Sequence, residues 1–264
     1  DKIQIGIVGD SFMQGNCVER EYTLGGQVRN KFSKTIVSAS AGNGSLSNLA
    51  SLIEYLSDKE PEVVLWFFYA GNDLIEQNDE RNNFTILKKY LEENNFKQNL
   101  KLYQKEIDKR LVSIAERENP VNLKSRLREI VFLFVFRELF DELTIIISQI
   151  IQKNNPELSL DTNKFDLENE IKYLIKVLLT AKKQVESWSG NFITIYIPYQ
   201  TEMFLEETPD YYLITNDIFN ELMKQNNINN IDIVSKLKKE KNIKELYALD
   251  IPYSKYGSTH FDED

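Results

Sequence analysis

Five stretches of the chain carry the pattern of buried β-strands. In the first four, apolar residues predominate and many of them are β-branched or aromatic, as in parallel strands covered on both faces. The run EVVLWFFY at residues 62–69 is nearly continuous in this respect. The predicted strands are residues 2–9, 35–39, 62–69, 191–199 and a short last one at 243–249.

Helical patterns separate the first three of these strands and follow the fourth. Leu24, Val28 and Phe32 recur four residues apart, which places them on one face of a helix. The pattern also predicts helices over residues 46–56 and 211–225. Strands that alternate with helices predict an α/β protein with a parallel sheet and right-handed crossovers.

The alternation stops between the third and the fourth strand. Apolar residues there recur at spacings of three and four, as Leu100 and Tyr103 do, and strand patterns are almost absent. We therefore expect an α/β core formed by residues 1–75 and 191–264, interrupted by a helical insertion of residues 76–190.

Residues 130–151 within this insertion are rich in Ile, Leu, Val and Phe, and their length suits a membrane span. Four charged residues in the middle would be costly at bilayer depth, so we interpret the segment as a buried or amphipathic helix. Contact with a membrane surface or with a second copy of the chain are the alternatives. The four charged residues are Arg137, Glu138, Asp141 and Glu142.

The composition is that of a folded globular protein and excludes several classes of function. Apolar residues make up 42% of the 264, including 15 Phe and 13 Tyr, which excludes disorder as the main state. A net charge of −9 argues against a nucleic-acid groove, which needs Lys and Arg to neutralise phosphates. The single cysteine, Cys17, and the single histidine, His260, exclude an intrachain disulfide and a His/Cys zinc cluster, so we expect no metal or cofactor. The polar run at residues 224–232 is interpreted as a solvated turn.

Small and polar residues follow the predicted strands, at the edge where α/β proteins form ligand crevices. Ser11 follows the first strand in GDSF, Gly42 the second in AGNG, and Asn72 the third in AGND. Backbone N–H groups and an asparagine amide at this edge could surround an oxyanion. A serine needs a base to act as a nucleophile, and the only histidine, His260, follows the last predicted strand. A Gly-Asp-Ser tripeptide alone is also a common helix cap, so the other segments carry the interpretation.

The four segments resemble the sequence blocks of the SGNH (GDSL-type) hydrolase superfamily, which is named for Ser, Gly, Asn and His. They appear in the family order as GDSF, AGNG, AGND and STHF, and intervals of 31 and 30 residues between the first three suit one βα unit each. The resemblance covers about residues 2–75 and 191–264. It implies a three-layer α/β/α, flavodoxin-like fold with about five parallel strands, and ester hydrolysis or acyl transfer through an acyl-serine.

By this resemblance, Ser11 is the nucleophile and His260 is the general base and then the general acid. The oxyanion hole is expected to consist of the N–H groups of Ser11 and Gly42 and the amide of Asn72. Gly44 replaces Gly42 in this role if the second block is aligned two residues later.

The acidic residues of the motifs and the acid of the triad need separate treatment. Asp10 and Asp73 are expected to fix their loops through hydrogen bonds to the backbone. The family usually has an aspartate three residues before the histidine, where it orients the ring, but this position is Gly257. A Ser–His dyad, a backbone carbonyl or a distant acid are the alternatives for orienting His260.

Three functions are compatible with the resemblance. The first is a serine esterase or O-acyltransferase that acts on a short acyl group, above all acetyl, on a carbohydrate, as in bacterial SGNH proteins of surface-polysaccharide pathways. Its partner would be a small-molecule or glycan ester. The second is a catalytically degenerate relative that binds a glycan or assembles a complex, which Gly257 favours. The third is a lipase-like esterase, with the helix at residues 130–151 as a lid.

The resemblance also bears on the compartment, and the first residue bears on how the chain is processed. We expect an extracytoplasmic location, periplasmic or surface-associated, rather than a cytoplasmic one. The chain begins at Asp1 and not at Met, with no signal-like segment in front of it, so we expect a processed or excised piece.

Overall fold

The computed structural model describes residues 2–15, 19–40, 44–118, 166–198, 202–203 and 214–239. Several sequence-based predictions concern other residues. The features that lie outside the described residues are the strand at 243–249, the helix at 130–151, Cys17, Gly42, Gly257 and His260.

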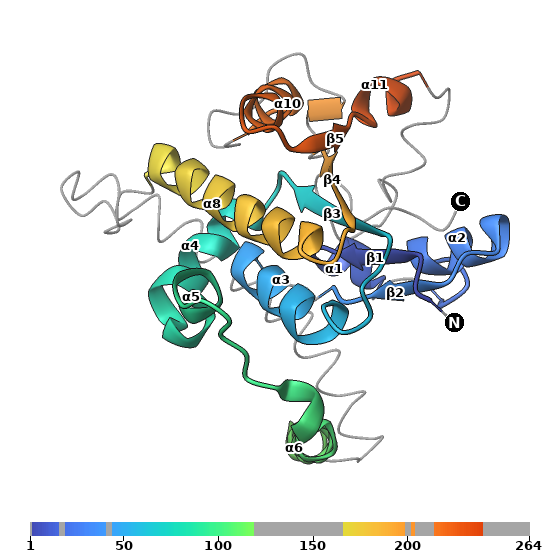
Figure 1. Ribbon diagram of the computed structural model, residues 1–264, viewed down its shortest axis with the longest axis vertical. Coiled ribbons are helices and arrows are strands. Elements are labelled where there is room, and N and C mark those ends of the chain that lie inside the picture. Colours follow the sequence, from blue (N-terminus) through green and yellow to red (C-terminus); the bar gives the residue numbers. More distant parts are fainter. Residues whose placement is uncertain are drawn as a thin grey trace, which may run out of the picture. The chain divides into compact units, whose positions relative to one another are not determined.

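Within the described residues, a sheet of five strands forms the centre of the fold (Figure 1), and each pair of neighbouring strands is parallel. The order β2-β1-β3-β4-β5 is that of flavodoxin-like proteins. The predicted fold class is therefore confirmed. The strands are β1 (Ile5–Val8), β2 (Ile36–Ser38), β3 (Val63–Tyr69), β4 (Asn191–Ile197) and β5 (Asn229–Ile231).

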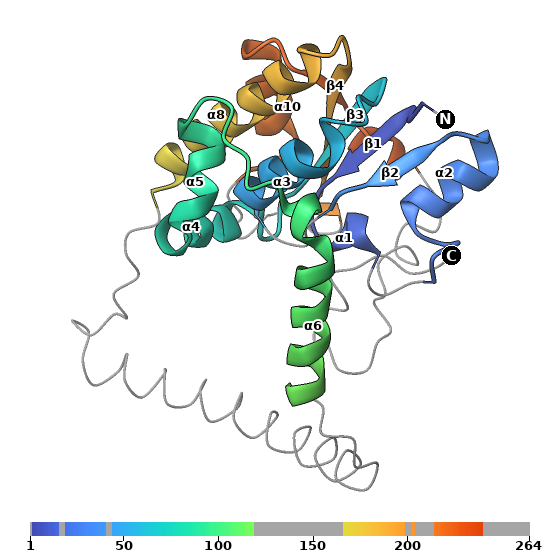
Figure 2. The same ribbon diagram turned by 60° about the horizontal axis from the view of Figure 1, so that its bottom comes forward.

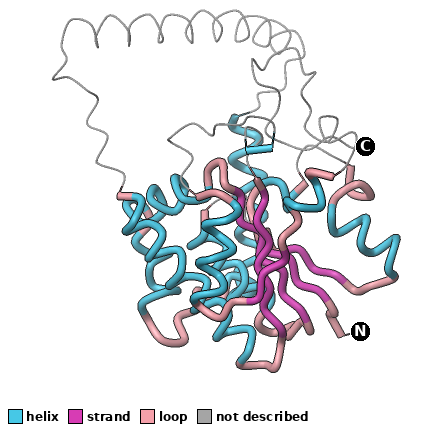
Figure 3. Tube along the Cα trace, turned by 90° about the horizontal axis from the view of Figure 1, so that it is seen from above, coloured by secondary structure: helices cyan, strands magenta, loops and turns pink. Residues whose placement is uncertain are grey.

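Helices cover both faces of the sheet, which makes it the middle one of three layers (Figures 2 and 3). Right-handed crossovers that step in one direction along the sheet lie on the same face, and those that step back lie on the other. On one face lie α3 (Ser45–Ser51), continued by a π-helical turn (Leu52–Leu56), α8 (Leu167–Glu186) and α10 (Asn216–Gln225). On the other face lie α1 (Ser11–Gln14) and α2 (Leu24–Phe32).

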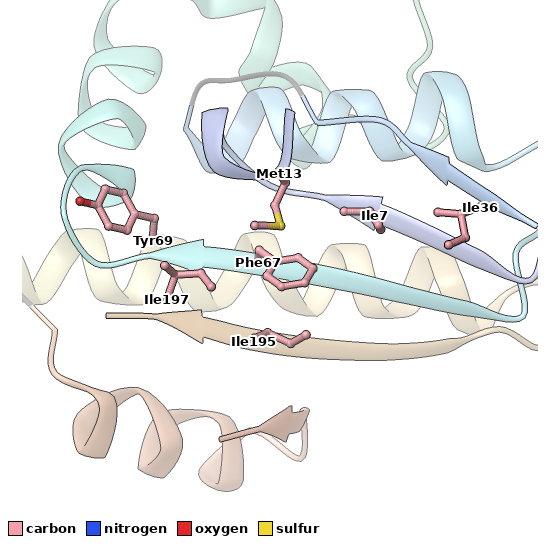
Figure 4. Packing of buried hydrophobic residues seen from close by; sticks show 7 residues of the cluster. All are labelled: Ile7, Met13, Ile36, Phe67, Tyr69, Ile195 and Ile197. Atoms are coloured by element: carbon pink, nitrogen blue, oxygen red, sulfur yellow. The ribbon is translucent and has the colours of Figure 1, made fainter. Parts of the chain in front are cut away.

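The alternation of side chains along β3 supplies a core to each of the two faces. Phe68 stacks on Phe219 of α10, with ring centroids 5.0 Å apart. Phe67 points to the opposite face, where it packs in the cluster of Figure 4 beside Met13 of α1. The buried members of that cluster are Ile7, Met13, Ile36, Phe67, Tyr69, Ile195 and Ile197.

A fifth strand lies where the sequence predicted a turn, and the strand predicted at residues 243–249 lies outside the described residues. The interpretation of residues 224–232 as a solvated turn is wrong for Asn229–Ile231, which forms β5. This strand is short and lies at the sheet edge, so polar side chains are tolerated and contribute hydrogen bonds. The Thr194 hydroxyl on β4 lies 2.9 Å from Oδ1 of Asn230 and 3.1 Å from the carbonyl oxygen of Asn229, and it can donate to either.

The chain divides into two compact units. Residues 1–101 and 167–264 form the first, and residues 102–166 form the second. The described residues between 76 and 190 form helices and no strand, and the helical insertion with these boundaries stays a prediction. Besides the sheet, the first unit contains α4 (Asp73–Asn83), α5 (Thr85–Glu92) and α11 (Val234–Leu237); the helix described in the second is α6 (Gln104–Glu118).

The described helices differ from membrane spans in length or in apolar content. Within the part of the chain that the structure describes, none of them is both long and apolar enough to cross a bilayer. The segment at residues 130–151, a predicted contact with a membrane surface or with a second copy, lies outside the described residues.

Candidate active site

The strand order reverses between β1 and β3, because the chain passes from β1 outward to β2 but from β3 outward to β4. The crevice outside the carboxyl ends of two such strands is the usual ligand site of open α/β sheets. Ser11 is the first residue of α1, shortly after β1, and Asn72 is the N-cap of α4, shortly after β3. Two of the four predicted site residues therefore follow the two strands that flank this crevice.

Side-chain contacts tie the loops after β1, β2 and β3 to one another. The ring of Phe12, next to the serine, lies 4.6 Å from the ring of Tyr69 at the end of β3, centroid to centroid. The hydroxyl of Ser38, the last residue of β2, donates to the carbonyl oxygen of Met13 at 3.5 Å. The turn that carries Ser11 is thus held from both neighbouring strands.

Two buried aspartates fix the backbone on either side of the crevice. Asp10 caps α1 by accepting a hydrogen bond from the backbone N–H of Phe12 at 3.0 Å. Asp73 accepts one from the backbone N–H of Tyr69 at 2.9 Å. Both side chains are almost fully buried. The prediction that these aspartates fix their loops through backbone hydrogen bonds is confirmed.

The same aspartates and a neighbouring glutamate form a group with perturbed protonation. Burial raises the pKa of Asp10 to about 6. Burial, and then the charge of Asp10, raises the pKa of Asp73 well above its ordinary value. Burial, followed by the charges of Asp10 and Glu80, raises the pKa of Glu76 to about 7. Since one oxygen of Asp10 and one of Asp73 are buried without a hydrogen-bond partner among the described residues, we expect this group to retain a proton near neutral pH.

Asn72 is oriented by the first turn of α4. Its amide nitrogen donates to Oε1 of Glu76 at 2.7 Å. An amide nitrogen carries two hydrogens, so this bond fixes the plane of the amide while leaving a second N–H for a ligand. The arrangement suits a hydrogen-bond donor held in place before a reaction begins.

The second block is described only from Gly44 onward, because Gly42 lies outside the described residues. Gly44 is the N-cap of α3 and packs directly on α4. A Cβ at this position would lie 2.7 Å from the backbone nitrogen of Gln77 and 2.8 Å from Oε2 of Glu80. Close packing on α4 therefore requires a glycine here, and it brings the segment after β2 next to the helix that begins at Asn72.

A pocket of about 380 Å³ opens beside these residues. Its lining includes Glu76, the partner of Asn72, and the exposed apolar side chains of Phe84 and Ile86. Among the described residues, no group of three Cys, His, Asp or Glu side chains is arranged to hold a metal ion. The lining residues are Gly44, Ser47, Glu76, Asp79, Glu80, Phe84, Ile86 and Leu87.

Glu76, Gln77 and Glu80 were not predicted from the sequence. Their positions three, four and seven residues after AGND were a usable signal, because this spacing places them on one side of a helix that begins at the motif. Their contacts could not be predicted. The partners of Gln77 and Glu80 are more than thirty residues away in sequence, and Asn72, the partner of Glu76, was expected to serve as an oxyanion donor.

We expect the protein to become more stable as the pH falls from about 8 to about 5. The folded pKa values of Asp10 and Glu76, about 6 and about 7, exceed the ordinary values of 3.8 and 4.5, so the folded chain binds more protons than the unfolded one in this window. Their stabilising contribution is complete below the unfolded pKa values and is lost as the pH rises through the folded ones. Urea unfolding at several pH values measures this slope, and Glu76→Gln should flatten it. A stability that does not change or that falls towards pH 5 would contradict this assignment.

Comparisons with known proteins identify no family for this chain. No protein-family model matches the chain, and no curated protein matches it. Among solved structures, the crystal structure of TesA is similar at a TM-score of 0.46 and 9% sequence identity, with 98% of this chain and 89% of that chain covered. The fold assignment rests on the strand order and register, not on this match.

Proposed function

We propose that the protein is a serine hydrolase or acyltransferase of the SGNH type, in which Ser11 attacks an ester. The observation that carries the proposal is the convergence of the Ser11 and Asn72 turns at the carboxyl ends of β1 and β3, in contact through Phe12 and Tyr69. A nucleophile and an oxyanion donor must approach the same carbonyl group from two loops, and this crevice brings two loops together.

The proposed reaction follows from these roles. The Ser11 hydroxyl oxygen bonds to the ester carbonyl carbon as its proton passes to the imidazole of His260. The carbonyl oxygen becomes an oxyanion, for which the N–H groups of Ser11 and Gly42 and the amide of Asn72 are the proposed donors. Collapse of the intermediate expels the alkoxide, which takes the proton from His260, and leaves an acyl group on Ser11. Water or a sugar hydroxyl then removes this acyl group by the same steps in reverse.

The base in this proposal lacks the family's usual acid, since position 257 is glycine. An imidazolium next to Ser11 would lie near Asp10, whose carboxylate is ionised above a pH of about 6. A nearby negative charge favours the protonated imidazole, as the missing aspartate would. We therefore propose a Ser–His dyad in which the negative charge of Asp10 takes the place of the missing acid. Such a dyad should hydrolyse generic esters slowly.

The lining of the neighbouring pocket supports a hydroxylated substrate, and we propose a glycan ester with an acetyl group as the first candidate. The carboxyl groups of Glu76 and Asp79 can accept hydrogen bonds from hydroxyl groups. Phe84 and Ile86 offer an apolar surface on which the C–H face of a sugar ring could pack. A long acyl chain would require a deeper apolar lining than these two side chains provide.

The substrate proposal is tested by acetate release from an O-acetylated oligosaccharide, compared with hydrolysis of p-nitrophenyl acetate and of a long-chain p-nitrophenyl ester. We expect Phe84→Ala to raise KM for the oligosaccharide about 5-fold to 30-fold, the effect of losing 1–2 kcal/mol of apolar contact, with no effect on p-nitrophenyl acetate. Phe32→Ala, which removes an exposed aromatic ring from α2, is the matched control. A preference for the long-chain ester would instead favour the lipase-like alternative.

A further inference from the structure

The carboxylate of Glu80 caps the N-terminus of α3, a helix more than thirty residues earlier in the sequence. The N-cap of α3 is Gly44, which has no side chain to cap the free N–H groups of the first turn. Glu80, on α4, accepts hydrogen bonds from the backbone N–H of Leu46 at 3.0 Å and of Ser47 at 3.3 Å. The hydroxyl of Ser47 donates to the same carboxylate. The side chain of Glu80 is only 5% exposed.

A second contact joins the same two helices one turn earlier on α4. The hydroxyl of Ser45 donates to Oε1 of Gln77 at 2.6 Å. The amide nitrogen of Gln77 in turn donates to the carbonyl oxygen of Glu170 on α8 at 2.9 Å. Because Gly44 also lacks room for a Cβ against this helix, the first turn of α3 and the middle of α4 form one tightly packed unit.

The buried side of α4 therefore carries three polar side chains that hold backbone or side chains at this sheet edge. Asp73 holds the backbone of Tyr69, Gln77 holds Ser45, and Glu80 holds the first turn of α3. The spacing of four and three residues keeps them on one side of the helix. Asn72 is the N-cap residue of the same helix, and its amide donates to Glu76 in the first turn, so a shift of α4 against α3 moves this amide.

We infer that Glu80 is a positioning residue. It fixes α4, the helix that presents Asn72, against the segment that leads from β2 into α3. This inference rests on the function proposed above, in which Asn72 is an oxyanion donor. Glu80 acts through position alone and touches neither the nucleophile nor the developing charge. A displacement of about 1 Å in such a donor is enough to cost about 100-fold in rate.

A matched control is available in Glu54, another buried carboxylate that accepts backbone hydrogen bonds. It lies in the π-helical turn after α3 and accepts from the backbone N–H of Gln98 at 2.6 Å and of Leu100 at 2.9 Å. The hydroxyl of Tyr90 donates to it at 2.7 Å. Its partners are on α5 and the segment that follows it, and not on the loops at the carboxyl edge of the sheet.

The test compares Glu80→Ala, Glu80→Gln and Glu54→Gln in folded protein, with an ester substrate. We expect Glu80→Ala to lower kcat about 10-fold to 100-fold at nearly constant KM, and Glu80→Gln, which keeps an acceptor oxygen, to recover part of this loss. Glu54→Gln should lower the urea midpoint but leave kcat unchanged. In an Asn72→Ala background the effect of Glu80→Ala on kcat should largely disappear, because both act through one donor. Equal losses of kcat in the Glu54 and Glu80 variants, or full additivity with Asn72→Ala, would overturn the inference.

Amide hydrogen exchange separates this inference from the proposed function. Glu80→Gln is the variant least prone to misfolding. In this variant we expect faster exchange at the backbone N–H groups of Leu46 and Ser47. We also expect it at Tyr69, whose N–H donates to Asp73 next to Asn72. Faster exchange at Leu46 and Ser47 alone would show that Glu80 only caps α3, and would overturn the inference. A wild-type chain without hydrolase activity would remove the proposed function, while the exchange result would still decide whether Glu80 holds the two elements in register.

Discussion

Replacing Ser11 by alanine is expected to reduce hydrolysis of a short-chain chromogenic ester to background, a loss of at least about 10⁴-fold in kcat. The acyl-serine cannot form without the hydroxyl oxygen, so every step of the proposed reaction is lost. The fold should remain, because α1 is capped by the side chain of Asp10 and not by Ser11.

Ser187→Ala is the matched control for this variant. Ser187 is an exposed serine whose hydroxyl donates to the carbonyl oxygen of Gln184, after the end of α8 and ahead of β4. It lies at the opposite edge of the sheet from Ser11. Its variant should keep full activity, and circular dichroism should report the same fold for both. Full activity in folded Ser11→Ala would remove Ser11 from the mechanism.

Replacing Asn72 by alanine is expected to lower kcat by about 10²-fold to 10³-fold while KM changes little. The amide of Asn72 is proposed to donate to charge that develops only in the transition state. Loss of one such donor costs about 3 to 4 kcal/mol of transition-state stabilisation. The substrate carbonyl oxygen carries little charge before the reaction, so binding of the ground state should be almost unaffected.

Two further variants show whether this loss belongs to the amide itself. Asn82→Ala removes an exposed asparagine near the other end of α4, where its amide contacts Asn78, and should have no effect on kcat. Glu76→Gln keeps the Asn72 amide but weakens the acceptor that orients it, so an intermediate loss is expected. A loss that appeared only in KM would make Asn72 a residue that binds the substrate.

The central strands were predictable because a strand that is buried on both faces has apolar residues at consecutive positions. β3 and β4 lie between neighbours on both sides and under helices on both faces, so nearly every position is apolar. β5 lies at the edge and contains Asn229 and Asn230, whose polar side chains find partners on β4. An edge strand with polar hydrogen-bond partners does not require apolar residues, so the sequence of β5 contains no apolar pattern from which it could be predicted.

The candidate site was predictable to the extent that it depends on strand ends. Ser11 and Asn72 follow parallel strands, and parallel strands that neighbour one another end at the same edge. The role of Glu80 depends instead on hydrogen bonds to residues more than thirty positions away, which no local spacing specifies. The reason for glycine at position 44 likewise became visible only from the packing of α3 on α4.

The claim that Ser11 is a nucleophile is tested most directly by covalent labelling with a fluorophosphonate, which reacts with activated serines. Peptide mass spectrometry of the labelled protein should find the phosphonyl group on Ser11, and labelling should disappear in Ser11→Ala. A protein that is folded and remains unlabelled at Ser11, while a serine esterase in the same tube is labelled completely, would contradict the account.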